Sequence, residues 1–217
     1  MTKYSLSNIK LFFNKNFHLL TFIYFFFLLF SSYQPTLEPF EYGAIRKIYN
    51  PELKGNLVYD PQFHFNYFFY FIISFFENYS YENKINITTY IFWFYDRFLT
   101  LILLYSLCKI LFKNKNYQLF AIILSTTFII NDSMQVDQKS FLFPFFLLSL
   151  IFILKEKYVL SGFFTALIFY FHVGWGFWWL IPSSFALFFS FFFINNFKII
   201  FFYKYFISAI VFSSPII

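Results

Sequence analysis

Residues 33–77 carry the sequence YQPTLEPFEYGAIRKIYNPELKGNLVYDPQFHFNYFFYFIISFFE, a polar segment that passes into an aromatic run. It lies between a first apolar stretch at residues 17–30 and a series of apolar stretches that continues to the end of the chain. Whether residues 63–76 cross a membrane decides the direction of every later segment. Carboxylates, basic residues and a histidine also gather in this segment. We therefore expect any chemistry to involve it.

The composition excludes an ordinary soluble domain. The chain has 217 residues, of which 60% are hydrophobic and 12% are charged, whereas soluble domains carry about 25% charged residues. One globular core cannot hide so many apolar side chains, so a bilayer must be part of the solvent. The single cysteine, Cys108, excludes an internal disulfide. The sequence has no glycine-rich phosphate loop, basic nucleic-acid patch or Cys/His metal spacing, so we expect no nucleic-acid partner and no cofactor, with a divalent metal left open.

Charge decides how residues 63–76 are placed. The run is about 14 residues long, which is short for a membrane span. If it crossed, Lys109, Lys113 and Lys115 would lie outside, against the positive-inside tendency. We therefore place residues 33–88 outside, with a surface helix over 40–50 and a second helix over 63–76 that dips in without crossing. The N-terminus is then cytoplasmic, and residues 17–32 form an uncleaved first span.

The later apolar runs then alternate across the membrane. The predicted spans are residues 89–112, 117–130, 141–154, 158–171, 175–194 and 199–213. The predicted fold is an all-α, polytopic transmembrane bundle of about seven spans. It forms one domain over residues 1–217, with two juxtamembrane helices in the outer loop 33–88 and the helical bundle in 89–217. The chain stops in hydrophobic sequence, as a truncated reading frame would.

Three outer-loop carboxylates are the candidate catalytic groups, because a carboxylate can act as a general base. Glu41 precedes Ile45 by one turn and so falls on the apolar side of the surface helix. A carboxylate that faces this way is either paired or functional, so Glu41 ranks above Asp60 and Glu38. The alternative for all three is ordinary solvated loop charge.

Asp96 and Arg97 lie about two turns inside the second predicted span. Charges at the centre of a membrane helix cost about 2.5–3.5 kcal/mol on insertion scales and usually face a cavity or a partner. In the functional interpretation, Arg97 holds a phosphate from a lipid carrier, which suits a guanidinium fork. In the alternative, the helix begins later and both residues lie in the headgroup layer.

Two more polar residues are predicted at the outer ends of spans. His172 opens the sequence HVGWGFWW, in which the two glycines allow a tight turn or close packing. It either contacts substrate or is a structural histidine at a helix end. Lys139 lies outside, against the positive-inside tendency. It either binds an anionic ligand or pairs with Asp137.

Short motifs in these segments resemble a family of bacterial polytopic membrane proteins. The sequence IRKIYNPEL at residues 45–53, followed by Asp60, resembles their first outer loop. Gln138-Lys139-Ser140-Phe141, then Ser161-Gly162 and FHVG at residues 171–174, resembles their small-residue helix that ends in His and Gly. The family is similar to GT-C glycosyltransferases. The resemblance implies one helix, then a large outer loop with two juxtamembrane helices, and then a helical bundle. This chain would be the N-terminal portion of such a protein.

The resemblance also implies an activity on the outer face of the bacterial inner membrane. A sugar would pass from a polyprenyl-phosphate donor, so membrane lipids and that donor are the implied partners. Glu41 would be the base for the acceptor hydroxyl, Arg97 (with Asp96 beside it) or Lys139 would contact the donor phosphate, and His172 would line the site. A transporter or flippase component and a non-catalytic membrane subunit stay open. Paired broken helices would favour a transporter, and the sequence shows none.

Overall fold

The computed structural model describes residues 11, 15–26, 36–37, 74–76, 78–132, 135–136, 138–194 and 197–214. A helical segment over 15–26 is followed by α4 (Tyr81–Leu111), α5 (Lys115–Asp132), α6 (Gln138–Leu154), α7 (Tyr158–Phe171), α8 (Val173–Phe193) and α9 (Ile199–Ser213). The two-residue strands β1 (Thr36–Leu37) and β2 (Gln135–Val136) pair in parallel. The predicted all-α class is confirmed for these ranges. The two predicted juxtamembrane helices lie wholly or largely outside them.

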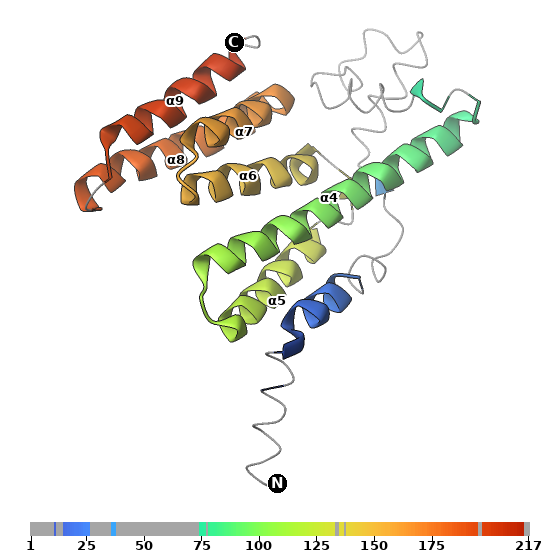
Figure 1. Cartoon of the computed structure of the whole chain (residues 1–217). Coiled ribbons are helices and arrows are strands. Elements are labelled where there is room, and N and C mark those ends of the chain that lie inside the picture. Colours follow the sequence, from blue (N-terminus) through green and yellow to red (C-terminus); the bar gives the residue numbers. More distant parts are fainter. Residues whose placement is uncertain are drawn as a thin grey trace.

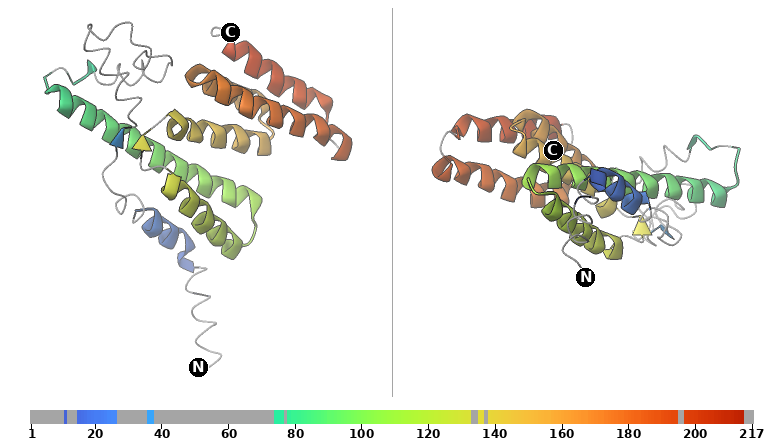
Figure 2. Two further views of the ribbon diagram at one scale, coloured as in Figure 1. Left: turned by 180° about the vertical axis from the view of Figure 1, so that it is seen from behind. Right: turned by 60° about the horizontal axis from the view of Figure 1, so that its bottom comes forward.

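Helix α6 lies between α4 and the group formed by α7, α8 and α9 (Figure 1; Figure 2, left). One apolar cluster joins α4 to α6 through Leu103, Leu104, Leu107, Leu147 and Ile151. A second cluster joins α7, α8 and α9 through Tyr158, Phe169, Leu180, Leu187, Tyr205 and Ala209. The N-terminal helix packs on α4, where Phe17 stacks on Tyr105 with ring centroids 6.5 Å apart and the His18 ring is hydrogen bonded to the Tyr105 hydroxyl.

Two helices among the described residues are long and apolar enough to cross a bilayer, namely Asn86–Leu111 and Val173–Phe193. They indicate a membrane protein. The shorter apolar helices are Phe17–Phe26, Leu142–Leu154, Tyr158–Phe171 and Ile199–Ser213. A 15-residue helix such as α9 rises about 22 Å, which is less than the hydrocarbon thickness of about 30 Å. Helix length alone therefore supports fewer spans than the sequence predicts.

Helix α4 begins at Tyr81, earlier than the predicted start at residue 89. Glu82 and Lys84 are good helix formers that hydropathy does not register, so the apolar run marks only part of the helix. The helix has 31 residues and rises about 46 Å. Asp96 and Arg97 consequently lie near its middle. The helix thus begins earlier than predicted, not later as the alternative requires, and the headgroup-layer position that the alternative gives both residues stays a prediction.

Glycine lets α7 approach α9 closely. A Cβ atom on Gly162 would lie 2.6 Å from the Tyr205 carbonyl oxygen and 2.9 Å from the Ala209 nitrogen, both backbone atoms of α9. Small residues at such positions allow membrane helices to pack backbone to backbone. Gly176 of α8 is similar, since its Cβ would lie 2.4 Å from the ring of Phe169 on α7. Close packing is thus confirmed for one of the two glycines after His172.

The α4–α5, α6–α7 and α8–α9 turns lie at the same end of the helices (Figure 1). They carry Lys113, Lys155, Lys157 and Lys198. In the α6–α7 turn Glu156 adopts a left-handed φ of 58°, and Lys157 N–H donates to the Phe152 carbonyl at 2.8 Å, as in a helix-ending Schellman motif.

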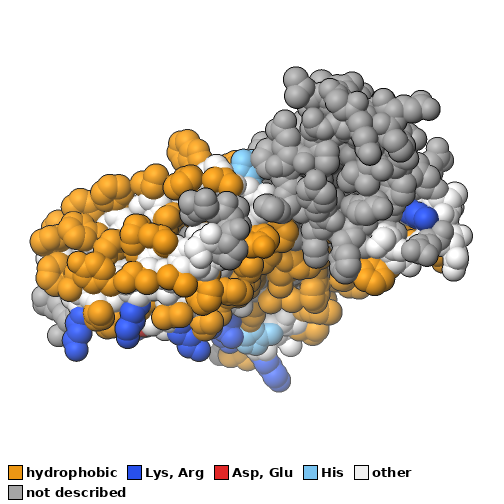
Figure 3. All heavy atoms as spheres, turned by 90° about the horizontal axis from the view of Figure 1, so that it is seen from above, with side chains coloured by type: hydrophobic (Ala, Val, Ile, Leu, Met, Phe, Trp, Pro, Cys, Tyr) orange, Lys and Arg blue, Asp and Glu red, His pale blue; other side chains and the backbone are white. Residues whose placement is uncertain are grey.

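Much of the described surface is hydrophobic, and Figure 3 shows lysines along one edge of such a face. Exposed apolar side chains on α8 and α9 include Phe177, Trp178, Phe185, Phe192, Ile207 and Val211. A face of this extent fits contact with lipid or with further protein better than contact with water.

Candidate functional site

The candidate site is centred on Asp96 and Arg97 of α4. Both side chains are buried, with exposed fractions of 7% and 5%. Thr100 lies one turn further along α4, and its Oγ1 donates to Asp96 Oδ1 at 3.3 Å. The leucine cluster with α6 begins on the following turn, so the charged pair lies directly beside the α4–α6 packing. Ionisable residues buried in an otherwise apolar membrane helix mark functional sites by default.

A short strand pair brings residues 36–37, near the start of the predicted outer loop, to α4. Thr36 pairs with Gln135 and Leu37 pairs with Val136, and β2 itself contacts α4. Glu38 follows Leu37 in the sequence. This pairing links the polar segment that opens the loop to the helix that carries Asp96 and Arg97. Glu38, Glu41 and Asp60 lie outside the described residues, so their catalytic roles stay predictions.

His172 links two helices. Its N–H donates to the Ile168 carbonyl at 2.9 Å, which ends α7. Its Nδ1 accepts from the Trp175 N–H at 3.3 Å, which caps the start of α8. A side chain that satisfies an N-terminal N–H of a helix stabilises that helix. These contacts match the structural interpretation of His172.

His172 lies at the α7–α8 junction, whereas the charged pair belongs to α4, and α6 packs against both α4 and α7. Lys139 belongs to the first turn of α6, and its side chain lies outside the described residues. A role for Lys139 in phosphate binding therefore stays a prediction. Of the residues predicted to bind substrate, Asp96 and Arg97 are the two that are both buried and adjacent on one helix.

Sequence reasoning missed a buried cluster of hydroxyls that joins four helices. Ser149 Oγ of α6 lies 3.0 Å from both Ser161 Oγ and Thr165 Oγ1 of α7. The Tyr205 hydroxyl of α9 lies 3.0 Å from Thr165 Oγ1 and 2.6 Å from Ser183 Oγ of α8. The indole N–H of Trp179 donates to Ser149 Oγ at 2.9 Å, which adds a second contact from α8.

Donors and acceptors in this cluster match without an ionised group. Ser161 Oγ also donates to the Ser149 carbonyl at 2.9 Å, and Thr165 Oγ1 donates to the Ser161 carbonyl at 3.1 Å. Each hydroxyl supplies one hydrogen and two acceptor positions. With these two donations made, the Ser149 hydrogen serves one of its two hydroxyl contacts, and every oxygen still has at least one hydrogen bond. Hydrogen bonds of this kind hold membrane helices together. The cluster therefore fixes the α6–α9 packing.

The described residues hold no group of three or more His, Cys, Asp or Glu side chains that could bind a metal ion. No protein-family model matches the sequence, and no curated protein or solved structure matches it either. The site is accordingly interpreted from the residues of this chain. Its chemical content is a buried guanidinium next to a carboxylate on α4, the helix that the short strand β2 also contacts.

Proposed function

We propose that the protein is a multi-pass membrane protein of about seven spans with a cytoplasmic N-terminus. Two arguments support this topology. The lysine-bearing turns lie at one end of the helices (Figure 1), as the positive-inside tendency requires. The shorter helix α9 bears exposed apolar side chains, as the longer helix α8 does. A short span can be accommodated by local bilayer thinning and snorkelling lysines.

In this orientation Arg97 binds the phosphate of a lipid-linked donor. The observation that carries the proposal is the burial of Arg97, with Asp96 beside it, inside the long apolar helix α4. A guanidinium presents five N–H donors in a fixed fork and binds phosphate oxygens in pairs. Asp96, held by Thr100, balances part of the positive charge when no phosphate is bound.

The proposed reaction is the transfer of a sugar from a polyprenyl-phosphate donor on the outer membrane face. Glu41 accepts the proton of the acceptor hydroxyl, whose oxygen forms a bond to the anomeric carbon of the sugar. The bond from that carbon to the phosphate oxygen breaks, and negative charge develops on the leaving phosphate. Arg97 stabilises this charge in a site shielded from water, where such stabilisation is strongest.

Replacing Arg97 by Gln tests the proposal. Hydrogen bonds to charged groups contribute about 1.5–3 kcal/mol, so R97Q should weaken polyprenyl-phosphate binding about 10- to 150-fold. Sugar transfer should fall with it. R97K should keep part of the binding, because it keeps the charge but loses the fork. The matched control is K109Q, which removes a positive charge from the last turn of α4.

The outcomes separate the proposals. Binding and transfer that survive unchanged in R97Q would remove Arg97 from the site. Binding that depends on Arg97 without any sugar transfer would favour a flippase component for a lipid-linked substrate. Equal losses in R97Q and K109Q would show only a general effect of charge.

A further inference from the structure

The start of α7 lies against the start of α9. Tyr158, the first residue of α7, is buried. Its ring stacks on the Phe201 ring with centroids 4.8 Å apart and meets the Phe197 ring edge-on at 6.1 Å. Lys157 directly precedes Tyr158, and Lys198 directly follows Phe197. These aromatic contacts therefore place two exposed lysines at the starts of adjoining helices, at one end of the bundle (Figure 1).

Positive charge prevails at this end of the bundle. The three turns that lie there contain one acidic residue, Glu156, and four exposed lysines, namely Lys113, Lys155, Lys157 and Lys198. Neither α7 nor α9 has an acidic residue in its first turn. We call the last three lysines, which belong to the adjoining α6–α7 and α8–α9 turns, the lysine edge. Its excess of positive charge suits an anionic partner.

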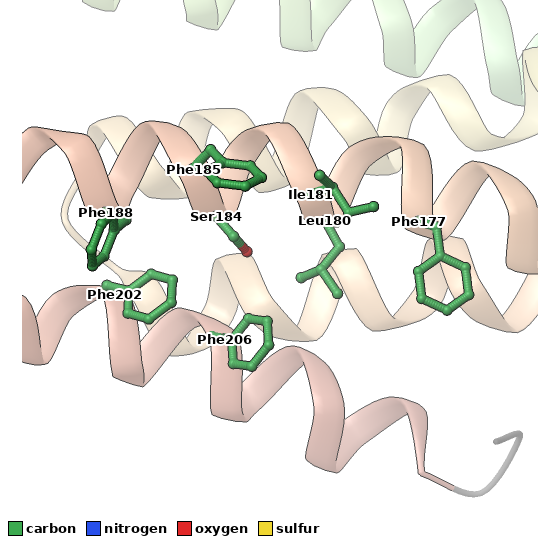
Figure 4. Close-up of a pocket in the computed structure, with 8 residues that line it drawn as sticks. All are labelled: Phe177, Leu180, Ile181, Ser184, Phe185, Phe188, Phe202 and Phe206. Atoms are coloured by element: carbon green, nitrogen blue, oxygen red, sulfur yellow. The ribbon is translucent and has the colours of Figure 1, made fainter.

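Apolar side chains continue from the lysine edge along the helices. Leu154 and Leu160 are exposed on either side of the α6–α7 turn, and Phe193 at the end of α8 has an exposed fraction of 82%. One turn into α9, Phe202 meets Phe188 of α8 with ring centroids 5.8 Å apart, in the wall of an apolar groove (Figure 4). Figure 3 shows lysines along the border of a hydrophobic face.

A surface that passes from lysines to exposed apolar side chains matches a bilayer leaflet, in which hydrocarbon meets a layer of phosphates. Lysine stems can lie along apolar surface while their ammonium groups reach the headgroups. A nucleic acid would pair with the same lysines, but it would leave the neighbouring apolar side chains in water, which is unfavourable. The combination therefore favours a lipid partner.

We infer that the lysine edge binds the phosphate groups of anionic phospholipids in the surrounding leaflet. The ammonium groups of Lys155, Lys157 and Lys198 contact the phosphates, and the apolar side chains beside them contact the acyl chains. A zwitterionic lipid carries its own cation next to the phosphate and is attracted less. In the proposed topology these lipids belong to the cytoplasmic leaflet, but the binding itself does not depend on that orientation.

Native mass spectrometry of the full chain in detergent, titrated with phosphatidylglycerol or phosphatidylcholine, tests the inference. Wild type should bind phosphatidylglycerol more tightly than phosphatidylcholine. K157Q should weaken phosphatidylglycerol binding about five-fold and K157Q/K198Q about 30-fold, from the roughly 1 kcal/mol that each lysine contributes to the attraction for anionic lipid. The matched control is K84Q, which removes a lysine from the first turn of α4 and should change the binding less.

Several outcomes would overturn the inference. Equal affinity for the two lipids would remove the selectivity for anionic headgroups, and equal losses in K84Q and K157Q would show only a general effect of charge. Full competition by glycerol 3-phosphate, which has the phosphate but no acyl chain, would assign the lysine edge to a soluble anion. Binding of a short mixed-sequence RNA that K157Q/K198Q abolishes would assign it to a nucleic acid. R97Q tests the polyprenyl-phosphate site separately, so the two proposals can fail independently.

Discussion

Replacing Gly162 by Ala should separate α7 from α9. The new Cβ would lie 2.6 Å from the Tyr205 carbonyl oxygen, whereas ordinary contact begins at 3.4 Å, so the helices must move apart by about 0.8 Å there. The same shift would stretch the 3.0 Å contact between Thr165 Oγ1 and the Tyr205 hydroxyl beyond hydrogen-bond range. Overpacking costs about 1–3 kcal/mol, and an interhelical hydrogen bond in a membrane protein contributes about 0.6 kcal/mol on average.

The assay is reversible unfolding of the detergent-solubilised protein, with G174A as the control. A Cβ on Gly174 would meet nothing nearer than the His172 ring at 3.3 Å, and that ring is a side chain that can adjust. Both substitutions replace a helical glycine by alanine, so the helix-propensity gain of up to about 1 kcal/mol cancels in the comparison. G162A should be less stable than G174A by about 1–3 kcal/mol. Equal stabilities would refute the close α7–α9 packing.

Two further predictions concern the same bundle. Y205F removes the hydroxyl that joins α7, α8 and α9 and should lower unfolding free energy by about 0.6–1.7 kcal/mol. The control is Y203F on the exposed side of α9, and equal effects would argue against the cluster. E156G places glycine at the left-handed residue of the α6–α7 turn and should raise unfolding free energy by about 0.5–1 kcal/mol. A loss of stability in E156G would show that the Glu156 side chain contributes more than its backbone strain costs.

Hydropathy predicted some helices closely and others only in part. The bounds predicted for α7 and α9 agree with the structure, and in both cases a lysine directly before the apolar run, Lys157 or Lys198, marks the start of the helix. Helix α4 extends beyond its apolar run, since its first turns contain polar residues that still favour a helix. A hydropathy pattern records the part of a helix that suits hydrocarbon and does not record where its hydrogen bonds begin.

The sequence indicated the charged residues of the candidate site but not the hydroxyl cluster. Asp96 and Arg97 could be found because charge stands out in an apolar run. Ser149 and Ser183 could not, because a single serine in a membrane helix can bond to its own backbone and gives no sign of a distant partner. Tyr205 lies among 18 tyrosines and 43 phenylalanines, so its position carried no signal. The i, i+4 spacing of Ser161 and Thr165 was the one available hint of a polar face.

The central claim is that the chain crosses the membrane repeatedly with its lysine turns in the cytoplasm. Cysteine labelling in intact cells tests it, and the wild type supplies the unreactive background because Cys108 is buried. A cysteine replacing exposed Asn78, just before α4, should react with a membrane-impermeant maleimide without permeabilisation. A cysteine replacing Lys155 in the α6–α7 turn should react only after permeabilisation. Reaction of both from the same side would contradict the topology and the outer-face site built on it.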